Sequence, residues 1–166
     1  MKGLVVLFLL AGVLLAGCGT AVDKADSMDA VNNVNNVVVT HSFSDIMGSE
    51  WKLKEVYING ADTLFRRESL PDYNELFTLA FIDQTMSGVG APNRFSAPYT
   101  LSDNQAISVL PARATLMASL WEPEYLKEHE YFNYITNLFK WNIVNGNLEL
   151  SSRTGDGRDV RLVFER

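Results

Sequence analysis

FTLAFIDQTMSGV, at residues 77–89, is the stretch of sequence that decides the fold. Phe77, Leu79 and Phe81 alternate with smaller or polar residues, which is the pattern of a strand with one buried face. Asp83-Gln84 interrupts this pattern, and a second strand-like run follows. The stretch therefore predicts two antiparallel strands joined by a tight turn.

Similar short apolar runs lie on both sides of this stretch. Asn145-Gly146-Asn147 separates one pair, and Asn59-Gly60 follows the run at residues 51–58; these residues adopt the positive φ angles that tight hairpins need. Polar residues 102–105 separate another pair. The predicted strands are residues 51–58, 77–81, 85–89, 94–101, 106–110, 141–144, 148–151 and 160–164.

Only residues 122–140 have the spacing of a helix. Tyr125, Phe132, Ile135 and Phe139 form one apolar stripe, and a proline lies in the first turn, where its missing N–H costs nothing. A chain with several strands, one helix and more strands predicts a mostly-β fold of the α+β class. We expect a strongly twisted antiparallel sheet or partial barrel, with one principal helix packed on it.

Composition limits the classes of function. The chain has 166 residues and is 47% hydrophobic, which is enough for one domain with a real core. Fourteen Lys and Arg face 20 Asp and Glu, for a net charge of −6. An acidic protein repels phosphate backbones, so we expect no nucleic-acid partner.

The N-terminus has the pattern of an export signal. Met1 and Lys2 form a short basic start, and Gly3 to Gly17 is an unbroken run of apolar and small residues. The alternative is a permanent membrane anchor, but the run is shorter than the ~20 residues that span a hydrocarbon core. We therefore expect residues 1–17 to be a signal peptide.

Leu15-Ala16-Gly17-Cys18 resembles the lipobox of bacterial lipoproteins. The small residues let the peptidase approach, and Cys18 supplies the sulfur that receives the lipid. The prediction is a membrane-anchored envelope protein carrying palmitate or a similar acyl chain, with an inert buried cysteine as the alternative. Gly19 is not the Asp that retains some lipoproteins at the inner membrane, which favours the outer membrane in a Gram-negative host.

Residues 18–43 contain few aromatic residues and include a repetitive stretch of Val and Asn, so we expect a flexible tether. Val37-Val38-Val39 could instead add an edge strand to the domain. The folded domain is predicted to be residues 44–166. We expect it to be a monomer.

Several short motifs in this domain resemble the META domain, also called HslJ-like. They include Trp51-Lys52-Leu53, Ser87-Gly88-Val89-Gly90, Thr115-Leu116-Met117-Ala118 and Leu162-Val163-Phe164. Where the family pattern has two cysteines, this chain has Ala91-Pro92 and Ser119. The resemblance implies an envelope lipoprotein, in some members heat-inducible, with a fold like that of lipoproteins that pilot secretins, and it implies no enzymatic activity. The residues that match the family motif are Gly88, Asn93, Arg94, Thr115, Met117 and Glu124.

No catalytic, metal or cofactor site is predicted. His129 lacks a second imidazole or thiolate at ligand spacing, and a zinc site needs at least three protein ligands. No serine stands in an elbow motif. The alternatives to a non-enzymatic protein are a small lipid-modifying enzyme or hydrolase, or an inhibitor module. No motif in the sequence supports any of them.

Aromatic residues are unusually dense around the predicted helix. More of them occur there than one buried stripe can accommodate. The surplus predicts a groove for an acyl chain or a partner peptide, with Trp121, Tyr131 and Tyr134 at its edge. The alternative is that these rings belong to an ordinary core. With or without such a groove, we expect a non-enzymatic envelope lipoprotein, a stress-related or pilot- or chaperone-like module that binds an envelope protein or a lipophilic ligand.

Overall fold

The computed structural model describes residues 41–69, 75–118 and 123–166. The predictions for the signal peptide, Cys18, Val37-Val38-Val39 and Trp121 lie outside these residues. The strands are β1 (Glu50–Ile58), β2 (Asp62–Arg66), β3 (Thr78–Ile82), β4 (Thr85–Val89), β5 (Arg94–Ser102), β6 (Ala106–Val109), β7 (Arg113–Ala114), β8 (Lys140–Val144), β9 (Asn147–Arg153) and β10 (Asp159–Glu165). The helix α1 is Glu128–Thr136, and two 3-10 turns are η1 (Phe43–Asp45) and η2 (Arg67–Ser69).

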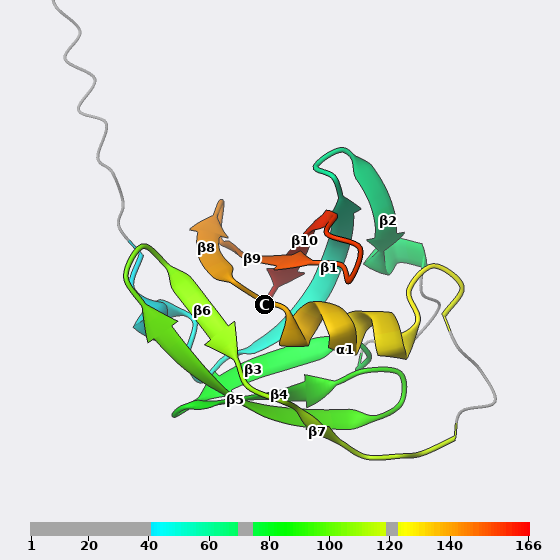
Figure 1. Ribbon diagram of the computed structural model, residues 1–166, viewed down its shortest axis with the longest axis horizontal. Coiled ribbons are helices and arrows are strands. Elements are labelled where there is room, and N and C mark those ends of the chain that lie inside the picture. Colours follow the sequence, from blue (N-terminus) through cyan, green and yellow to red (C-terminus); the bar gives the residue numbers. More distant parts are fainter. Residues whose placement is uncertain (1–40, 70–74, 119–122) are drawn as a thin grey trace, which may run out of the picture. The chain divides into compact units, whose positions relative to one another are not determined.

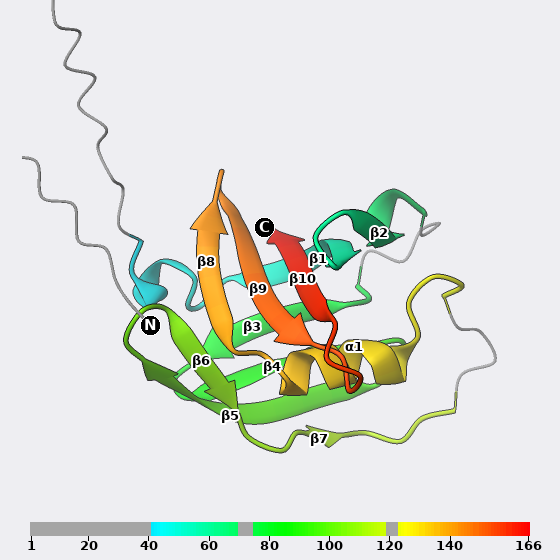
Figure 2. The same cartoon turned by 45° about the horizontal axis from the view of Figure 1, so that its top comes forward.

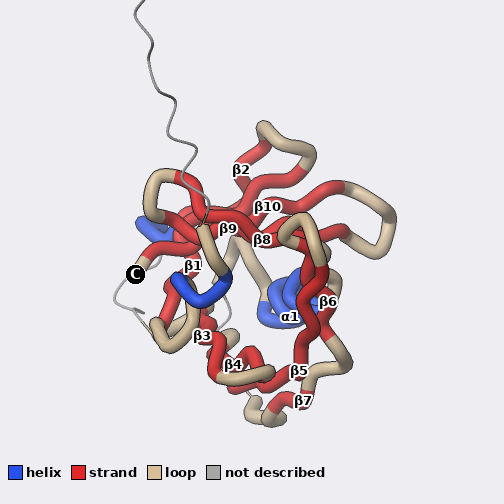
Figure 3. Tube along the Cα trace, turned by 90° about the vertical axis from the view of Figure 1, so that its left-hand side faces the viewer, coloured by secondary structure: helices blue, strands red, loops and turns tan. Residues whose placement is uncertain are grey.

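Eight of the described strands form a closed antiparallel barrel. The hydrogen-bonded order is β1-β10-β9-β8-β6-β5-β4-β3, and β3 pairs with β1 again to complete the ring (Figures 1 and 3). β2 extends the sheet beside β1, and β7 pairs with β5. The predicted mostly-β fold with one principal helix is confirmed, and the sheet closes fully because the first and last strands pair.

The predicted hairpin turns have the expected backbone. Asn59 has φ 51° and Gly60 has φ 85°, and Asn145 and Gly146 have φ 52° and 80°. Positive φ at both central residues matches the right-handed twist of the flanking strands. The β8–β9 turn has two residues between Val144 and Asn147, whereas the β1–β2 turn has three between Ile58 and Asp62.

Alternation along the strands fills the barrel interior. In β1, Trp51, Leu53 and Val56 are fully buried, with a bulge after Leu53 that shifts the alternation. Phe43 also belongs to the core: it is 8% exposed, and its ring lies 5.1 Å from the rings of Phe81 and Trp141. The folded part thus begins before the predicted boundary at residue 44, because this aromatic side chain covers apolar surface between β3 and β8.

The helix is shorter than the sequence pattern predicted. It begins after Lys127, whose backbone is extended at φ −78° and ψ 149°, and whose N–H donates to the Glu130 carboxylate at 2.9 Å. This capping bond fixes the start of the helix. Tyr125 and Phe139 consequently lie outside the helix and are 53% and 41% exposed, so the prediction that both belong to its buried stripe is wrong.

α1 lies between the two halves of the barrel (Figure 2). Tyr131 is fully buried, and its ring is 5.1 Å from Phe77 and 6.1 Å from Phe95 in β5. On the other side, Ser152 in β9 donates to the carbonyl of Tyr134 at 2.6 Å. The helix therefore joins the β3–β5 half to the β9 half.

Arg67 connects neighbouring segments at the end of β2. Its Nε donates to the Leu53 carbonyl at 2.6 Å, and one Nη donates to the carbonyls of Leu76 and Phe77 at 2.8 and 3.3 Å. Desolvation lowers the pKa of the guanidinium. These bonds satisfy carbonyls near the β1 bulge and at Phe77, which has φ 52°.

Candidate functional site

The carboxylate of Glu128, at the start of α1, binds the turn that precedes β5. Its Oε1 accepts from the backbone N–H groups of Ala91 and Asn93 at 2.6 and 2.5 Å, and its Oε2 accepts from the Asn93 side-chain amide at 2.7 Å. Hydrogen bonds to a charged acceptor are stronger than neutral ones. Glu128 therefore fastens the helix to the turn.

Asn93 extends this network to the segment after β7. Its Oδ1 accepts from the Thr115 hydroxyl at 2.8 Å and from the Met117 N–H at 2.7 Å, and its Nδ2 also donates to the Met117 carbonyl at 3.2 Å. Asn93 is only 6% exposed. We call the residues Glu128, Asn93, Thr115 and Met117 the Asn93 clamp.

Two glycines, in β4 and just after it, make room for neighbouring segments. A Cβ at Gly88 would lie 1.9 Å from the Thr78 carbonyl oxygen, and a Cβ at Gly90 would lie 2.7 Å from the Glu128 Oε1. Neither glycine is needed for a positive φ, since neither backbone lies in that region. Both positions require glycine for close approach alone.

The polar groups of the clamp are bonded to one another. The Asn93 amide and both Glu128 oxygens have partners within the fold, so they are not free to act on a substrate. The clamp contains no histidine, and His129 makes no side-chain hydrogen bond with the described part of the chain. Among residues 41–69, 75–118 and 123–166, no group of three or more His, Cys, Asp and Glu is placed to hold a metal ion.

The family-motif residues identified in the sequence do not all join the clamp. Gly88 lies in β4 against Thr78 and Phe95 and not against the clamp. The Arg94 backbone pairs with Thr115 at 3.0 and 3.1 Å, while the Arg94 side chain is exposed. Glu124 is exposed in the segment before α1 and makes none of these bonds. The acidic residue that holds the turn is Glu128, four residues further along the chain, which no sequence motif singled out.

A signal for Glu128 was present in the sequence. A carboxylate in the first turn of a helix is stabilised by the N-terminal partial charge of the helix. With the helix expected to start at residue 122, the carboxylates of its first turn would be Glu122 and Glu124. The misplaced helix start thus hid the carboxylate that the structure uses.

The groove prediction is wrong for Tyr131 and Tyr134. They are 0% and 5% exposed, and the Tyr131 hydroxyl donates to the Thr78 carbonyl at 3.1 Å. Desolvation raises the pKa of both hydroxyls. The helix α1 contacts both halves of the barrel. Aromatic side chains on more than one face of the helix can therefore be buried. These two residues belong to the core, as the alternative interpretation held.

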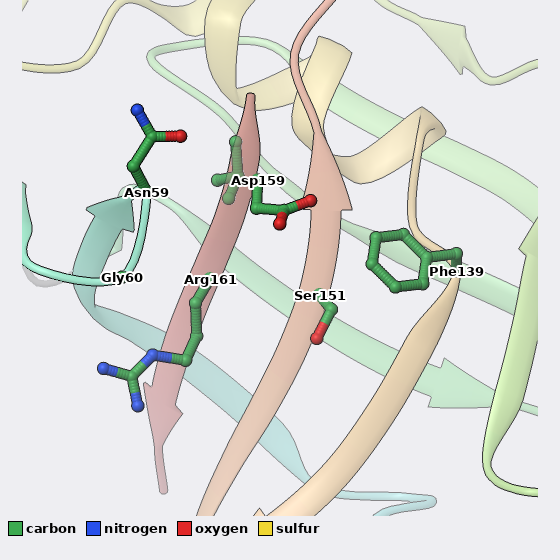
Figure 4. A pocket seen from close by; sticks show the side chains of 7 residues that line it. Asn59, Gly60, Phe139, Ser151, Asp159 and Arg161 are labelled. Atoms are coloured by element: carbon green, nitrogen blue, oxygen red, sulfur yellow. The ribbon is translucent and has the colours of Figure 1, made fainter. Parts of the chain in front are cut away.

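An open hollow of about 460 Å³ lies on the outer face of the barrel, over β9 and β10 (Figure 4). Arg161 and Ser151 are cross-strand partners on this outer face, whereas Leu162 and Leu150 point inward. The β1–β2 turn borders one side and the segment before β8 borders the other. The lining residues are Asn59, Gly60, Phe139, Ser151, Asp159, Val160 and Arg161.

The closed barrel and the single described helix define a small, mostly-β domain of the α+β class. The chain matches the model of the META domain over residues 44–164, and it belongs to this family. No curated protein matches the sequence.

Two solved structures are similar in fold. One is the NMR structure of a protein from Burkholderia xenovorans, with TM-score 0.52 and 17% identity, covering 74% of this chain and 85% of that one. The other is a DUF4847 family protein from Bacteroides vulgatus, with TM-score 0.48 and 11% identity, covering 72% of this chain and 94% of that one. At these identities the first likeness concerns the fold alone.

No helix within the described ranges has both the length and the apolar character needed to cross a membrane.

Proposed function

We propose that the protein is a lipid-anchored binding module of the bacterial envelope and is not an enzyme. In this role it is a pilot- or chaperone-like or stress-related lipoprotein, monomeric and held through Cys18. In a Gram-negative host we place it at the periplasmic face of the outer membrane. The domain presents a ligand site or partner surface to other envelope components.

The observation that carries this proposal is that the polar side chains of the Asn93 clamp bond to the fold itself. Asn93 and Glu128 bond to each other and to three backbone N–H groups, so these polar residues hold the scaffold together. A catalytic carboxylate or amide would instead present a free atom to substrate. The sequence at Leu15-Ala16-Gly17-Cys18 supports the anchor independently.

The anchor is tested by labelling cells with radioactive palmitate. The wild-type chain should be labelled and recovered with membranes, while Cys18→Ser should be unlabelled and should still fold, because Cys18 lies far from the barrel in sequence. Equal labelling of both proteins would contradict the anchor.

Cross-linking in intact cells, followed by mass spectrometry, then tests binding. Recovery of the wild type without any envelope component attached would contradict the role as a binding module.

A further inference from the structure

Several polar side-chain groups that line the hollow over β9 and β10 have no hydrogen-bond partner among the residues that the structure describes, unlike those of the Asn93 clamp. The Asn59 amide and the Ser151 hydroxyl make no side-chain hydrogen bond with the described part of the chain. Asp159 receives one bond, from Arg153 Nε to Oδ1 at 3.1 Å, which leaves its second oxygen free. Donors and acceptors that are not used by the fold therefore surround one space.

An aromatic ring borders the same space. Phe139 is 41% exposed, and its ring is directed from the segment before β8 toward Ser151 and Asp159 (Figure 4). The Arg153 guanidinium lies 5.1 Å from the ring centroid and covers part of the ring. The remaining apolar surface is available to a ligand, and its burial would favour binding.

Arg161 lines the hollow, and two contacts orient its guanidinium. Its guanidinium carbon lies 4.4 Å above the Tyr57 ring, and its Nη1 donates to the Glu149 carboxylate at 3.2 Å. The stacking and the ion pair orient the planar guanidinium, and its other N–H donors are available to a ligand. Since Arg161 and Asp159 each have an oppositely charged partner, neither contributes an uncompensated charge that would select an ion.

We propose that this hollow binds a neutral sugar unit of a polysaccharide, a proposal that rests on the proposed role as a binding module. A pyranose ring has an apolar C–H face that fits an aromatic ring, and its rim of hydroxyls both donates and accepts hydrogen bonds. The Phe139 ring, Asn59, Ser151, Asp159 and Arg161 supply these complementary groups. The volume is within the range of small-ligand sites.

Other ligand classes fit this surface less well. An acyl chain needs an apolar enclosure, whereas a hydroxyl, a carboxylate and a guanidinium line this space. A peptide that adds a strand needs an open sheet edge. The hollow instead lies over β9 and β10, which pair with each other, while the other edge of β10 pairs with β1.

The test is isothermal titration of the detergent-extracted, full mature protein with chitotetraose and, separately, with cellotetraose. We expect the wild type to bind at least one of them with a millimolar or tighter dissociation constant. Phe139→Ala and Asn59→Gly should each weaken binding about tenfold, equivalent to ~1.4 kcal/mol. Asn59→Gly removes the amide and keeps the turn, because glycine also adopts positive φ.

Leu101→Ala is the matched control, since Leu101 is 43% exposed on β5 and does not line the hollow. It should bind as the wild type does. The proposal is overturned if the wild type binds neither saccharide, or if Asn59→Gly and Phe139→Ala bind as tightly as the control. Intact palmitate labelling and a cross-linked envelope component alongside such a result would reject the sugar site alone and leave the proposed function standing.

Discussion

Asn93 donates and accepts hydrogen bonds with two distant parts of the chain. Its backbone N–H and its amide both reach Glu128, and its Oδ1 and Nδ2 reach the segment around Thr115 and Met117. An amide suits this position because it has a donor end for the carboxylate and an acceptor end for the N–H and hydroxyl groups. No other residue type offers both ends in the same shape.

The Asn93→Asp variant tests this requirement for an amide. The new carboxylate would face Glu128 where an amide donor lay 2.7 Å from its oxygen. We expect the free energy of unfolding at pH 7 to fall by about 2–4 kcal/mol, because a buried pair of like charges replaces a hydrogen bond. Urea unfolding measures this loss.

The same variant should show a characteristic pH dependence. Repulsion raises the folded-state pKa of one carboxyl above its unfolded value, so stability is recovered as pH falls below that pKa and lost as pH rises through it. Asn104→Asp is the control, because Asn104 is exposed in a turn. Equal, pH-independent behaviour of the two variants would show that the amide is not required.

The sequence identified three of the four clamp residues and missed Glu128. Gly88, Asn93, Thr115 and Met117 belong to short motifs that can be identified from the local sequence alone. Glu128 was missed because the helix was expected to start at residue 122, and its partner Asn93 could not be predicted because the contact joins residues 35 apart in the chain. Hydrogen bonds between distant segments become visible only when the fold is known.

At the level of elements, local patterns predicted the longer strands well. Strand alternation and the Asn-Gly turns are set by neighbouring residues, so β1, β3–β6 and β8–β10 lie close to their predicted positions. β7 has only two residues, which is too short for the alternation of apolar and polar residues to be recognised. The helix was predicted too long because apolar residues on both sides of α1 continue its spacing by chance while belonging to extended segments.

Gly88→Ala in β4 tests the close packing between neighbouring strands. The added Cβ would meet the Thr78 carbonyl oxygen in β3 and the Phe95 ring in β5. Because backbone must move to relieve this overlap, we expect a loss of about 1–3 kcal/mol in the free energy of unfolding.

Gly155→Ala is the matched control. A Cβ at Gly155 meets nothing within 4 Å, and its φ is not in the left-handed region, so stability should change by less than ~0.5 kcal/mol. Denaturant unfolding of the two variants compares them directly. A Gly88→Ala protein as stable as Gly155→Ala would refute the close-approach explanation.

For the whole molecule, the decisive feature is closure. β1 pairs with β10 from Lys52 opposite Glu165 to Ile58 opposite Val160, so the two ends of the domain meet. The sequence predicted a twisted sheet or partial barrel and left closure open, because the pairing of the first and last strands depends on the summed twist and length of the strands between them. The clamp then fastens α1 between the two halves.

The central claim is that the Asn93 clamp stabilises the barrel and that binding occurs on its outer surface. The most direct test is urea unfolding of Glu128→Gln beside Glu124→Gln, the exposed glutamate that the sequence had favoured. We predict that Glu128→Gln loses about 2–3 kcal/mol of unfolding free energy, because charge-assisted bonds to two backbone N–H groups are weakened. Glu124→Gln should change it by less than ~0.5 kcal/mol. Equal stability of the two variants, or a larger loss for Glu124→Gln, would contradict the account.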